Sequence, residues 1–404
     1  MKEYSGAIKR FSVTLLILSI VQLGNHLNLP GTTPQVANND GIMNFFASIS
    51  AGKSGELTLF SLGLSPYMIS FIVWNLFSLL EVDAIKSLSQ KQSGLIVRAI
   101  TLLFAILQAW ATLRSFEGNI LYDHFPSFSQ SQVDFFFLLL LTAGGMVIAY
   151  IADLNKDKGV GKQMILIFPG LLANMPRMLL TGGQDSALFS SVWGLVFIGG
   201  ATVVMVYVTS ILARSEYRIP VQQTAMTVAF KSSYIPIKVL TSGAFPFMFG
   251  ITLFSMPQMM LFLPAFQNNN LMAYIVTTFF SYSTVQGILT FGLILGLLGF
   301  GFSHMNIRSF DIAKGLRGAG DYIFDVRPGR DTEKYIRQKL NRIIFLNNSF
   351  ILLVSLTPLL VGLWYQPATV LSFYFSSLVM MVYFVHTMHE DIRFVLAKRH
   401  YVIF

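Results

Sequence analysis

Residues 57–80 read LTLFSLGLSPYMISFIVWNLFSLL, an apolar stretch without a charged side chain. As a helix, a stretch of this length can cross the hydrocarbon core of a bilayer, which is about 30 Å thick. Gly63 and Pro66 lie near its start, and a proline removes a backbone donor and crowds the preceding turn. A broken turn at membrane depth is tolerated where protein or a water-filled cavity satisfies the freed backbone groups. The stretch therefore predicts a helix that faces an interior pathway and not lipid.

A second apolar segment, residues 41–52 (GIMNFFASISAG), lies just before this stretch. It is too short to span a bilayer and is typical of a re-entrant or interfacial half-helix. A half-helix that dips into the membrane and is followed by a spanning helix suits a pore with its own stopper.

The composition of the whole chain indicates a polytopic α-helical membrane protein. Of 404 residues, 54% are hydrophobic and 12% are charged, and the mean hydropathy is +0.62. A soluble domain carries about 25% charged residues. The chain has no cysteine, which excludes disulfides, Cys-ligated zinc and thiol chemistry. None of the predicted spans has an Asp or Glu at its centre, which argues against an ion-coupled small-solute transporter and against an intramembrane enzyme.

Hydropathy predicts ten spans in two halves of five, residues 1–186 and 187–404. Glycine and proline interrupt the second, fifth and seventh spans, as Gly63/Pro66, Pro169/Gly170 and Gly243/Pro246. Interrupted helices in corresponding halves point to inverted repeats around a central path, although the halves show no plain sequence repeat. The predicted spans are 11–30, 57–80, 94–113, 134–152, 163–181, 189–212, 242–262, 285–305, 343–363 and 369–387.

Basic residues predict the orientation of these spans. Of the 28 Lys and Arg residues, all but Lys53, Arg114 and Arg177 fall in the termini and in alternate connections on one side. Cytoplasmic loops are the ones enriched in Lys and Arg, so both termini are expected in the cytoplasm. This asymmetry also accounts for the net charge of +9 without a nucleic-acid partner.

Two of the basic loops are expected to project from the membrane. The segment 213–241 alternates charged and β-branched residues and carries Pro220 and Pro236, which suggests a hairpin. The segment 306–342 contains a turn at 325–330 that places Arg327 and Arg330 at an exposed tip. Arginine presents a rigid fork of donors that suits carboxylates, so this loop is expected to dock a cytoplasmic partner. The alternative is a basic loop that serves only topology.

Five motifs, in order along the chain, resemble the SecY family, the central subunit of the protein-conducting Sec translocon. They are LGLSPYM (62–68), PGLLANMP (169–176), YRIPVQQ (217–223), SYIPIKVLTSGAFPFMF (233–249) and VRPGRDTEKY (326–335). The resemblance covers almost the whole chain. It implies an all-α channel of two pseudo-symmetric five-helix halves, hinged between the fifth and sixth spans.

The resemblance also implies roles for particular residues. A ring of apolar side chains would exclude water and ions by dewetting, and flexible methionines suit such a gasket. Residues 42–51 match the plug of the family. The second and seventh spans match its lateral gate, with Asn75 at a polar gate position. Arg327 matches its motor-docking loops, and Arg218 and Arg330 match them more loosely. The ring falls on Leu64, Met68, Ile167, Leu171, Met248 and Phe373.

Such a channel catalyses nothing itself. The resemblance implies a SecA-type ATPase as its motor, small SecE- or SecG-like or accessory membrane subunits, an unfolded preprotein as its substrate, the bilayer around it, and neither a cofactor nor a metal. Work would come from the motor or from the membrane potential.

Departures from the ordinary SecY pattern favour a paralogue. Tyr217 and Arg218 stand in place of a doubled arginine, Arg177 is an unusual charge, and the 151–162 loop lacks the usual Gly-rich run. The chain thus resembles the accessory Sec channel of some Gram-positive bacteria, which exports serine-rich glycosylated adhesins. The general housekeeping channel remains an alternative, and a small-solute secondary transporter is a more distant one.

Overall fold

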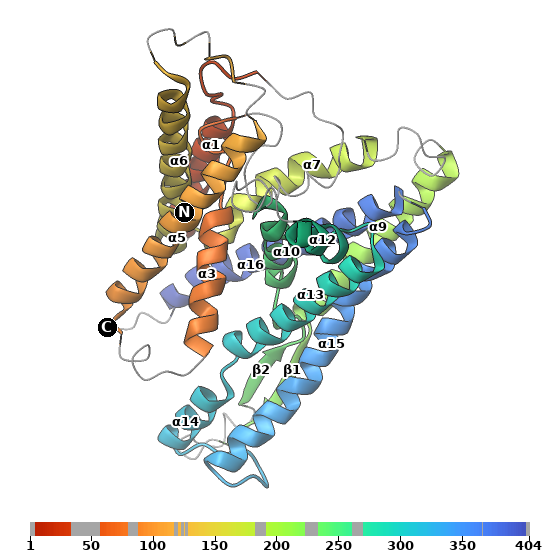
Figure 1. Ribbon diagram of the computed structural model, residues 1–404. Helices are drawn as coiled ribbons and strands as arrows, with labels where there is room; N and C mark the ends of the chain where they lie inside the picture. Colours follow the sequence, from red (N-terminus) through yellow and green to blue (C-terminus); the bar gives the residue numbers. More distant parts are fainter. Residues whose placement is uncertain are drawn as a thin grey trace.

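The architecture is a bundle of long apolar helices with a small mixed module at one end (Figure 1). The computed structural model describes residues 5–33, 57–79, 88–116, 120–122, 125, 128–181, 191–222, 233–260, 270–365 and 367–400. Within these ranges, seven helices are long and apolar enough to cross a membrane. The predicted plug, residues 42–51, lies outside them.

The described residues of the first half form five α-helices and one 3₁₀ turn. Helices α3 and α5 pack along each other, α5 packs on α6, and α6 packs on α1. Phe137 and Leu141 of α6, both fully buried, form the centre of an apolar cluster with the end of α5. The elements are α1 (Ser5–Asn25), α3 (Ser65–Leu79), α5 (Gln90–Ser115), α6 (Gln130–Lys158), η3 (Met164–Ile167) and α7 (Phe168–Thr181).

The second half is built around α15 and α16, which pack closely on each other. Helix α13 lies between α10 and α15, and α16 also contacts α7 and α9, so that α16 joins the two halves of the chain. The elements are α9 (Val192–Arg214), β1 (Glu216–Pro220), β2 (Tyr234–Lys238), α10 (Phe245–Met260), α12 (Asn270–Phe279), α13 (Val285–Asn306), α14 (Ser309–Ala319), α15 (Arg330–Gly362) and α16 (Pro367–His400).

In three of the ten predicted spans the helix begins later than expected. Helices α3, α7 and α10 start at Ser65, Phe168 and Phe245, whereas the spans were predicted from residues 57, 163 and 242. They belong to the second, fifth and seventh predicted spans, the same three in which glycine and proline suggested a break.

The position of these breaks differs from the prediction. Pro66, Pro169 and Pro246 do not interrupt a helix but each occupy its second residue. In the first turn of a helix the backbone N–H has no partner within the helix, so a proline there removes nothing. Turns at 59–64 and 241–244 and the 3₁₀ turn η3 precede the three helices. The prolines therefore lie in the first turns of three helices, each of which follows a turn of the chain.

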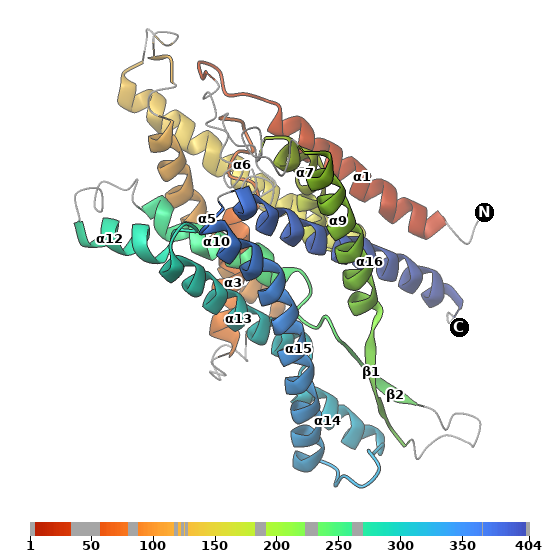
Figure 2. The same cartoon turned by 90° about the vertical axis from the view of Figure 1, so that its right-hand side faces the viewer.

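The loops 213–241 and 306–342 form one module. Strands β1 and β2 pair antiparallel, with Arg218 opposite Pro236, which confirms the predicted hairpin. Ile219 and Ile237 of the hairpin pack against Ile336 and Leu340 of α15, all of them buried. Helix α15 begins at Arg330, well before residue 343, where the ninth span was predicted to begin. Its first turns are stabilised by packing against the hairpin in this small core. Figure 2 shows the hairpin, α14 and the start of α15 extending from the same end of the bundle.

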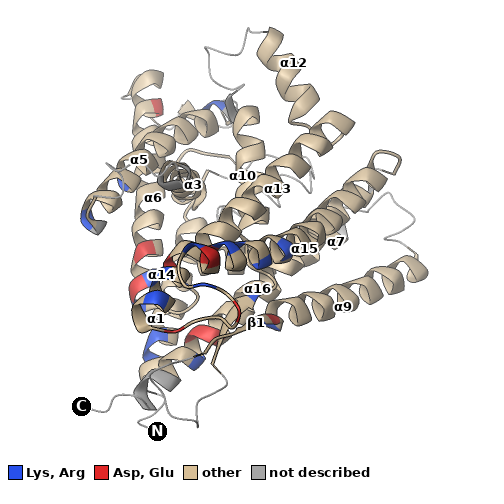
Figure 3. Cartoon of the chain, turned by 90° about the horizontal axis from the view of Figure 1, so that it is seen from below, with Lys and Arg blue, Asp and Glu red and all other residues tan. Residues whose placement is uncertain are grey.

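Basic side chains gather at that end. Figure 3, which looks at it directly, shows Lys and Arg concentrated on α14 and on the first turns of α15. Helices α12 and α13 are tan along their length in the same view, because neither contains a Lys, Arg, Asp or Glu residue. This agrees with the asymmetry of Lys and Arg along the sequence.

Candidate functional site

The six residues predicted to form a ring all lie in one buried apolar cluster. Each side chain is 2% exposed or less, so water does not reach them in this structure. Met68, Leu171 and Met248 lie within one turn of the starts of α3, α7 and α10, and Leu64 and Ile167 lie just before α3 and α7. Phe373 comes from α16. The cluster thus contains the beginnings of α3, α7 and α10, which come from both halves of the chain.

The starts of α3 and α10 repeat one sequence. Gly63 to Met68 and Gly243 to Met248 both read Gly-x-x-Pro-aromatic-Met. The two glycines have φ of 54° and 63°, in the left-handed region that glycine enters without strain. Gly63 N–H donates to Phe60 O and Gly243 N–H donates to Leu240 O, at 2.9 and 3.2 Å. The halves therefore share a repeat of six residues, which is too short to stand out when whole halves are compared.

We expect Gly243→Ala to destabilise the protein. A Cβ at Gly243 would lie 2.3 Å from Cζ of Tyr383, and a positive φ costs a non-glycine residue about 1–2 kcal/mol before that clash is counted. The measurement is the melting temperature of the purified protein in detergent. Gly200→Ala on α9 is the matched control, because nothing lies within 4 Å of its Cβ position, and it should leave the melting temperature unchanged or raise it. Equal melting temperatures for the two variants would contradict this reading of Gly243.

Helices α3 and α10 meet directly beside the ring. Oγ1 of Thr252 lies 3.7 Å from Sδ of Met68, and one turn further the rings of Phe71 and Phe249 stack at 5.9 Å. Phe249 also stacks on Phe302 of α13 at 5.0 Å. Offset aromatic pairs of this kind contribute about 0.5–1.5 kcal/mol each beyond their burial. These aromatic contacts could not be predicted from the sequence, since no local pattern marks which phenylalanines meet.

Aromatic rings also surround Phe373. Its ring meets Tyr282 edge-on at 5.0 Å, and Tyr282 contacts Phe254 of α10 at 4.5 Å. Tyr282 lies in the connection that precedes α13, and burial raises the pKa of its phenol above the ordinary value, so the ring stays neutral. These contacts connect α16 to α10 without a charged group.

Asn75, the predicted polar gate residue, lies on α3 and is half-buried. Its Nδ2 is buried and makes no hydrogen bond within the described part of the chain. A buried amide donor without a partner costs about 1–3 kcal/mol. Asn75 is therefore a polar group that would gain from contact with water or with another polar side chain.

A cavity of about 390 Å³ leads from the hairpin to the ring. Lys238 of β2 lies on its wall, and so do Lys162 and Met164 from the first half of the chain. Asn306 and Tyr383 contribute polar side chains, and the ring residue Met248 is also part of the lining. The cavity thus connects the basic end of the bundle with the apolar cluster and is walled by both halves.

The predicted docking arginines are exposed at the same end. Arg218 lies over the ring of Tyr234, with Cζ at 4.6 Å, and near Glu216 at 3.8 Å. Arg327 and Arg330 flank Gly329, whose φ of 109° only glycine adopts readily. The hydroxyl of Thr332 donates to the backbone oxygen of Arg327 at 2.9 Å, which holds the turn while the guanidinium points away from the core. The exposed ring of Phe324 lies on the same turn.

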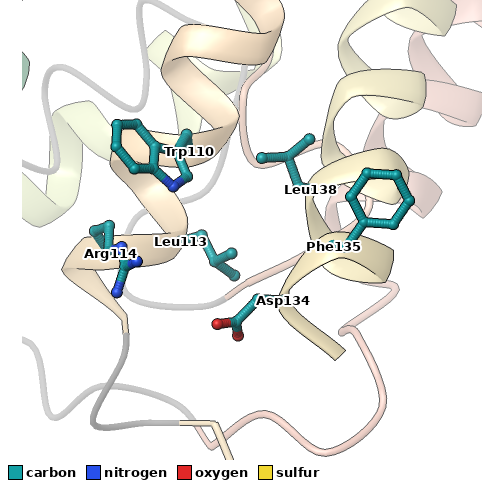
Figure 4. A pocket seen from close by; sticks show the side chains of 6 residues that line it. All are labelled: Trp110, Leu113, Arg114, Asp134, Phe135 and Leu138. Carbon is teal, nitrogen blue, oxygen red and sulfur yellow. The ribbon is translucent and has the colours of Figure 1, made fainter. Parts of the chain in front are cut away.

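A second, smaller cavity lies between the end of α5 and the start of α6 and measures about 190 Å³ (Figure 4). Asp134 lies on one side and accepts a hydrogen bond from Tyr122 at 3.0 Å, and Arg114 on the other side lies over Trp110. The remaining lining is apolar. This cavity is separate from the ring and takes no part in the path described above.

Comparison with known proteins identifies the fold and the family. A family profile described as SecY matches residues 58–388, which is most of the chain. The chain belongs to the SecY family. It is 27% identical to the accessory Sec system protein translocase subunit SecY2 of Streptococcus parasanguinis, over 82% of this chain and 80% of that protein. It is also 27% identical to the protein translocase subunit SecY of Mycoplasma pneumoniae, over 87% of this chain and 78% of that protein.

The fold agrees with this SecY assignment. A solved structure described as that of a protein conducting channel superposes with a TM-score of 0.68, covering 98% of this chain and 94% of its own, at 14% sequence identity. The likeness at this identity concerns the fold. It places α3 and α10, the helices that repeat the Gly-x-x-Pro-aromatic-Met sequence, within a SecY architecture.

Proposed function

We propose that this SecY-family chain is the central channel subunit of a Sec-type translocase and conducts unfolded preproteins across the cytoplasmic membrane. One observation carries the proposal: a cavity from the basic end of the bundle reaches Met248, one of six buried apolar side chains that come from both halves and share one cluster. Such a constriction excludes water and ions while it offers no fixed contact to a passing chain. The ring is Leu64, Met68, Ile167, Leu171, Met248 and Phe373.

The membrane arrangement that fits this function has ten crossings. In this arrangement the turns before α3 and α10 and the 3₁₀ turn η3 would complete the passage of α3, α7 and α10, and the seven long apolar helices among the described residues would each cross alone. Irregular backbone at membrane depth is tolerated when it lines a cavity, and Thr241 and Ala244 of the turn before α10 do line the larger cavity. The halves would be residues 1–186 and 187–404, with the plug at 42–51, both termini in the cytoplasm, and the gate between α3 and α10 with Asn75 beside it.

The exposed arginines at the basic end suggest which partner would bind there. Arg327, with Arg218 and Arg330, would dock a SecA-type ATPase through carboxylates on its surface, because exposed guanidiniums pair bidentately with such groups. The apolar outer faces of α1 and α9, with Trp193 83% exposed, leave room for lipid and for small SecE- or SecG-like subunits. The subunit itself would be a passive conduit.

We assign the chain to the accessory Sec system, with serine-rich glycosylated adhesins as its clients. The departures at Tyr217–Arg218, Arg177 and the 151–162 loop support this, and so do relatives that carry the SecY2 name. The second candidate is the general SecY channel. It is favoured by the 27% identity to the Mycoplasma pneumoniae SecY subunit, which equals the identity to the Streptococcus parasanguinis SecY2 subunit.

We expect deletion of the gene to remove one large serine-rich surface protein from the secreted fraction and to leave the other secreted proteins unchanged. The measurement is a comparison of surface and secreted proteins in the deletion strain and in a strain complemented on a plasmid. A broad export defect or lethality would instead establish the general channel. Unaltered export of all proteins, together with solute uptake by proteoliposomes, would contradict both.

A further inference from the structure

The phenol of Tyr67 bonds the start of α3 to two other segments. Its O–H donates to Oδ1 of Asp153 on α6 at 2.9 Å, and its oxygen accepts from Nε2 of Gln163 at 2.5 Å. Asp153 also lies 3.7 Å from a guanidinium nitrogen of Arg98 on α5. Tyr67 directly precedes the ring residue Met68, so these bonds fix the part of α3 that lines the constriction.

Gln163 is presented by a turn with unusual backbone geometry. Gly161 and Lys162 have φ of 81° and 57°, and Lys162 is one of two non-glycine residues with positive φ in the described part of the chain. Such a conformation persists only where the surroundings determine it. Fully buried Asn155 supplies that support, since its Nδ2 donates to Lys162 O at 2.5 Å. Thr14 of α1 in turn donates to Oδ1 of Asn155 at 2.9 Å.

Helix α16 reaches this turn from the other half of the chain. The backbone N–H of Gly161 donates to Oδ2 of Asp391 at 3.0 Å. The side chain of Met388 lies so close that a Cβ at Gly161 would meet its Cγ at 3.1 Å. Glu390, next to Asp391, forms an ion pair with Lys238 of β2. One turn of α16 therefore holds both the base of the hairpin and the turn that presents Gln163.

We propose that Asp391 and Tyr67 are positioning residues that form a polar relay between α16 and the pore-lining start of α3, and that this relay keeps the resting pore closed. The relay comprises Asp391, Gly161, Gln163, Tyr67 and Asp153. The inference rests on the proposed function, which places the motor at the hairpin and the constriction at Met68. Because Asp391 and Gly161 belong to different halves, separation of the halves at this end must lengthen or break their hydrogen bond. Displacement of the hairpin would reach α3 by the same route.

The test is the resting ion conductance of the full-length protein in planar bilayers. We expect Asp391→Ala and Tyr67→Phe each to raise the frequency of open events roughly three- to tenfold, the range that loss of one hydrogen bond supports. The double variant should open no more often than the stronger single variant, because both substitutions interrupt one relay. Asp391→Asn keeps an oxygen acceptor for Gly161 and should behave like the native protein.

Matched controls separate this role from general destabilisation. Arg393→Ala changes an exposed charge two residues further along α16, and Tyr207→Phe removes a phenol from the exposed face of α9. Both should leave the conductance unchanged. A purely structural role would lower the melting temperature without the non-additive effect on conductance. If Asp391→Ala does not insert into the membrane, Tyr67→Phe alone tests the relay, since phenylalanine keeps the aromatic side chain at residue 67 and removes only its hydroxyl.

The outcomes also distinguish the relay from the channel itself. The double variant Met68→Asn/Met248→Asn, which is expected to leak, is the positive control. If the positive control conducts ions while Asp391→Ala and Tyr67→Phe do not, or if the effects of these two variants on conductance are additive, the relay is refuted and the pore assignment is retained. If the positive control does not conduct either, both the pore assignment and the relay are refuted.

Discussion

Replacement of Met68 and Met248 by asparagine is expected to make the resting protein leak ions across a bilayer. Both side chains are fully buried in the ring, and both lie in the repeated Gly-x-x-Pro-aromatic-Met sequence. A buried amide without partners costs about 1–3 kcal/mol, and water in the constriction would relieve that cost. Two such groups shift the balance toward a hydrated pore by roughly tenfold or more, since every 1.4 kcal/mol is a factor of ten.

The measurement is single-channel conductance in planar bilayers, with the wild-type protein recorded under the same potential. Met68→Leu/Met248→Leu is the matched control: leucine is apolar and of similar volume, so this variant should stay closed. Normal resistance in the asparagine variant, with the protein shown to be inserted, would refute the ring assignment. A leak of equal size in the leucine variant would show that packing, and not polarity, closes the path.

Arg327→Glu should abolish export while the protein remains inserted and folded. The Arg327 side chain is exposed, and the described part of the chain contains no ion pair to it, so the substitution removes no known internal contact. The turn itself is held through the backbone oxygen of Arg327, which the variant keeps. A carboxylate at this position would repel the acidic surface that we propose for the motor. A loss of at least tenfold in exported client corresponds to about 1.4 kcal/mol of docking free energy.

Export of a client in cells, with the membrane level of the variant measured in parallel, tests this prediction. Arg342→Glu applies the same change of charge to an exposed residue further along α15 and should export normally. Arg327→Lys keeps the charge but loses the planar fork of donors, and an intermediate loss is expected. Unchanged export in Arg327→Glu would count against a docking role for this turn.

Much of the architecture could be predicted from the sequence, because hydropathy is a local property. The predicted spans and the hairpin all correspond to elements of the structure, and the three glycine- and proline-containing spans correspond to α3, α7 and α10. The bounds were less accurate. Pro66 and Pro246 were interpreted as interruptions, whereas the structure shows that they begin helices, since the left-handed Gly63 and Gly243 turn the chain just before them.

The residues of the candidate site were predicted, but the contacts between them were not. The six ring residues were placed by resemblance to a family, and the structure collects them in one buried cluster. The contacts that hold this cluster were not predicted: Thr252 beside Met68, the stacked Phe71 and Phe249, and Tyr67 between Asp153 and Gln163. The repeat of six residues at the starts of α3 and α10 was the one signal in the sequence that could have indicated two equivalent helices.

Apolar length, charge asymmetry and short motifs can be read along the chain, and they are enough to identify a multispanning helical protein of the SecY family with one basic end. Which residues meet is seen only when the helices are packed together. Asp391 and Gly161 are 230 residues apart, and Met68 and Thr252 are 184 apart. Contacts over such separations depend on how whole helices pack, and side-chain packing in three dimensions leaves no periodic trace in the sequence.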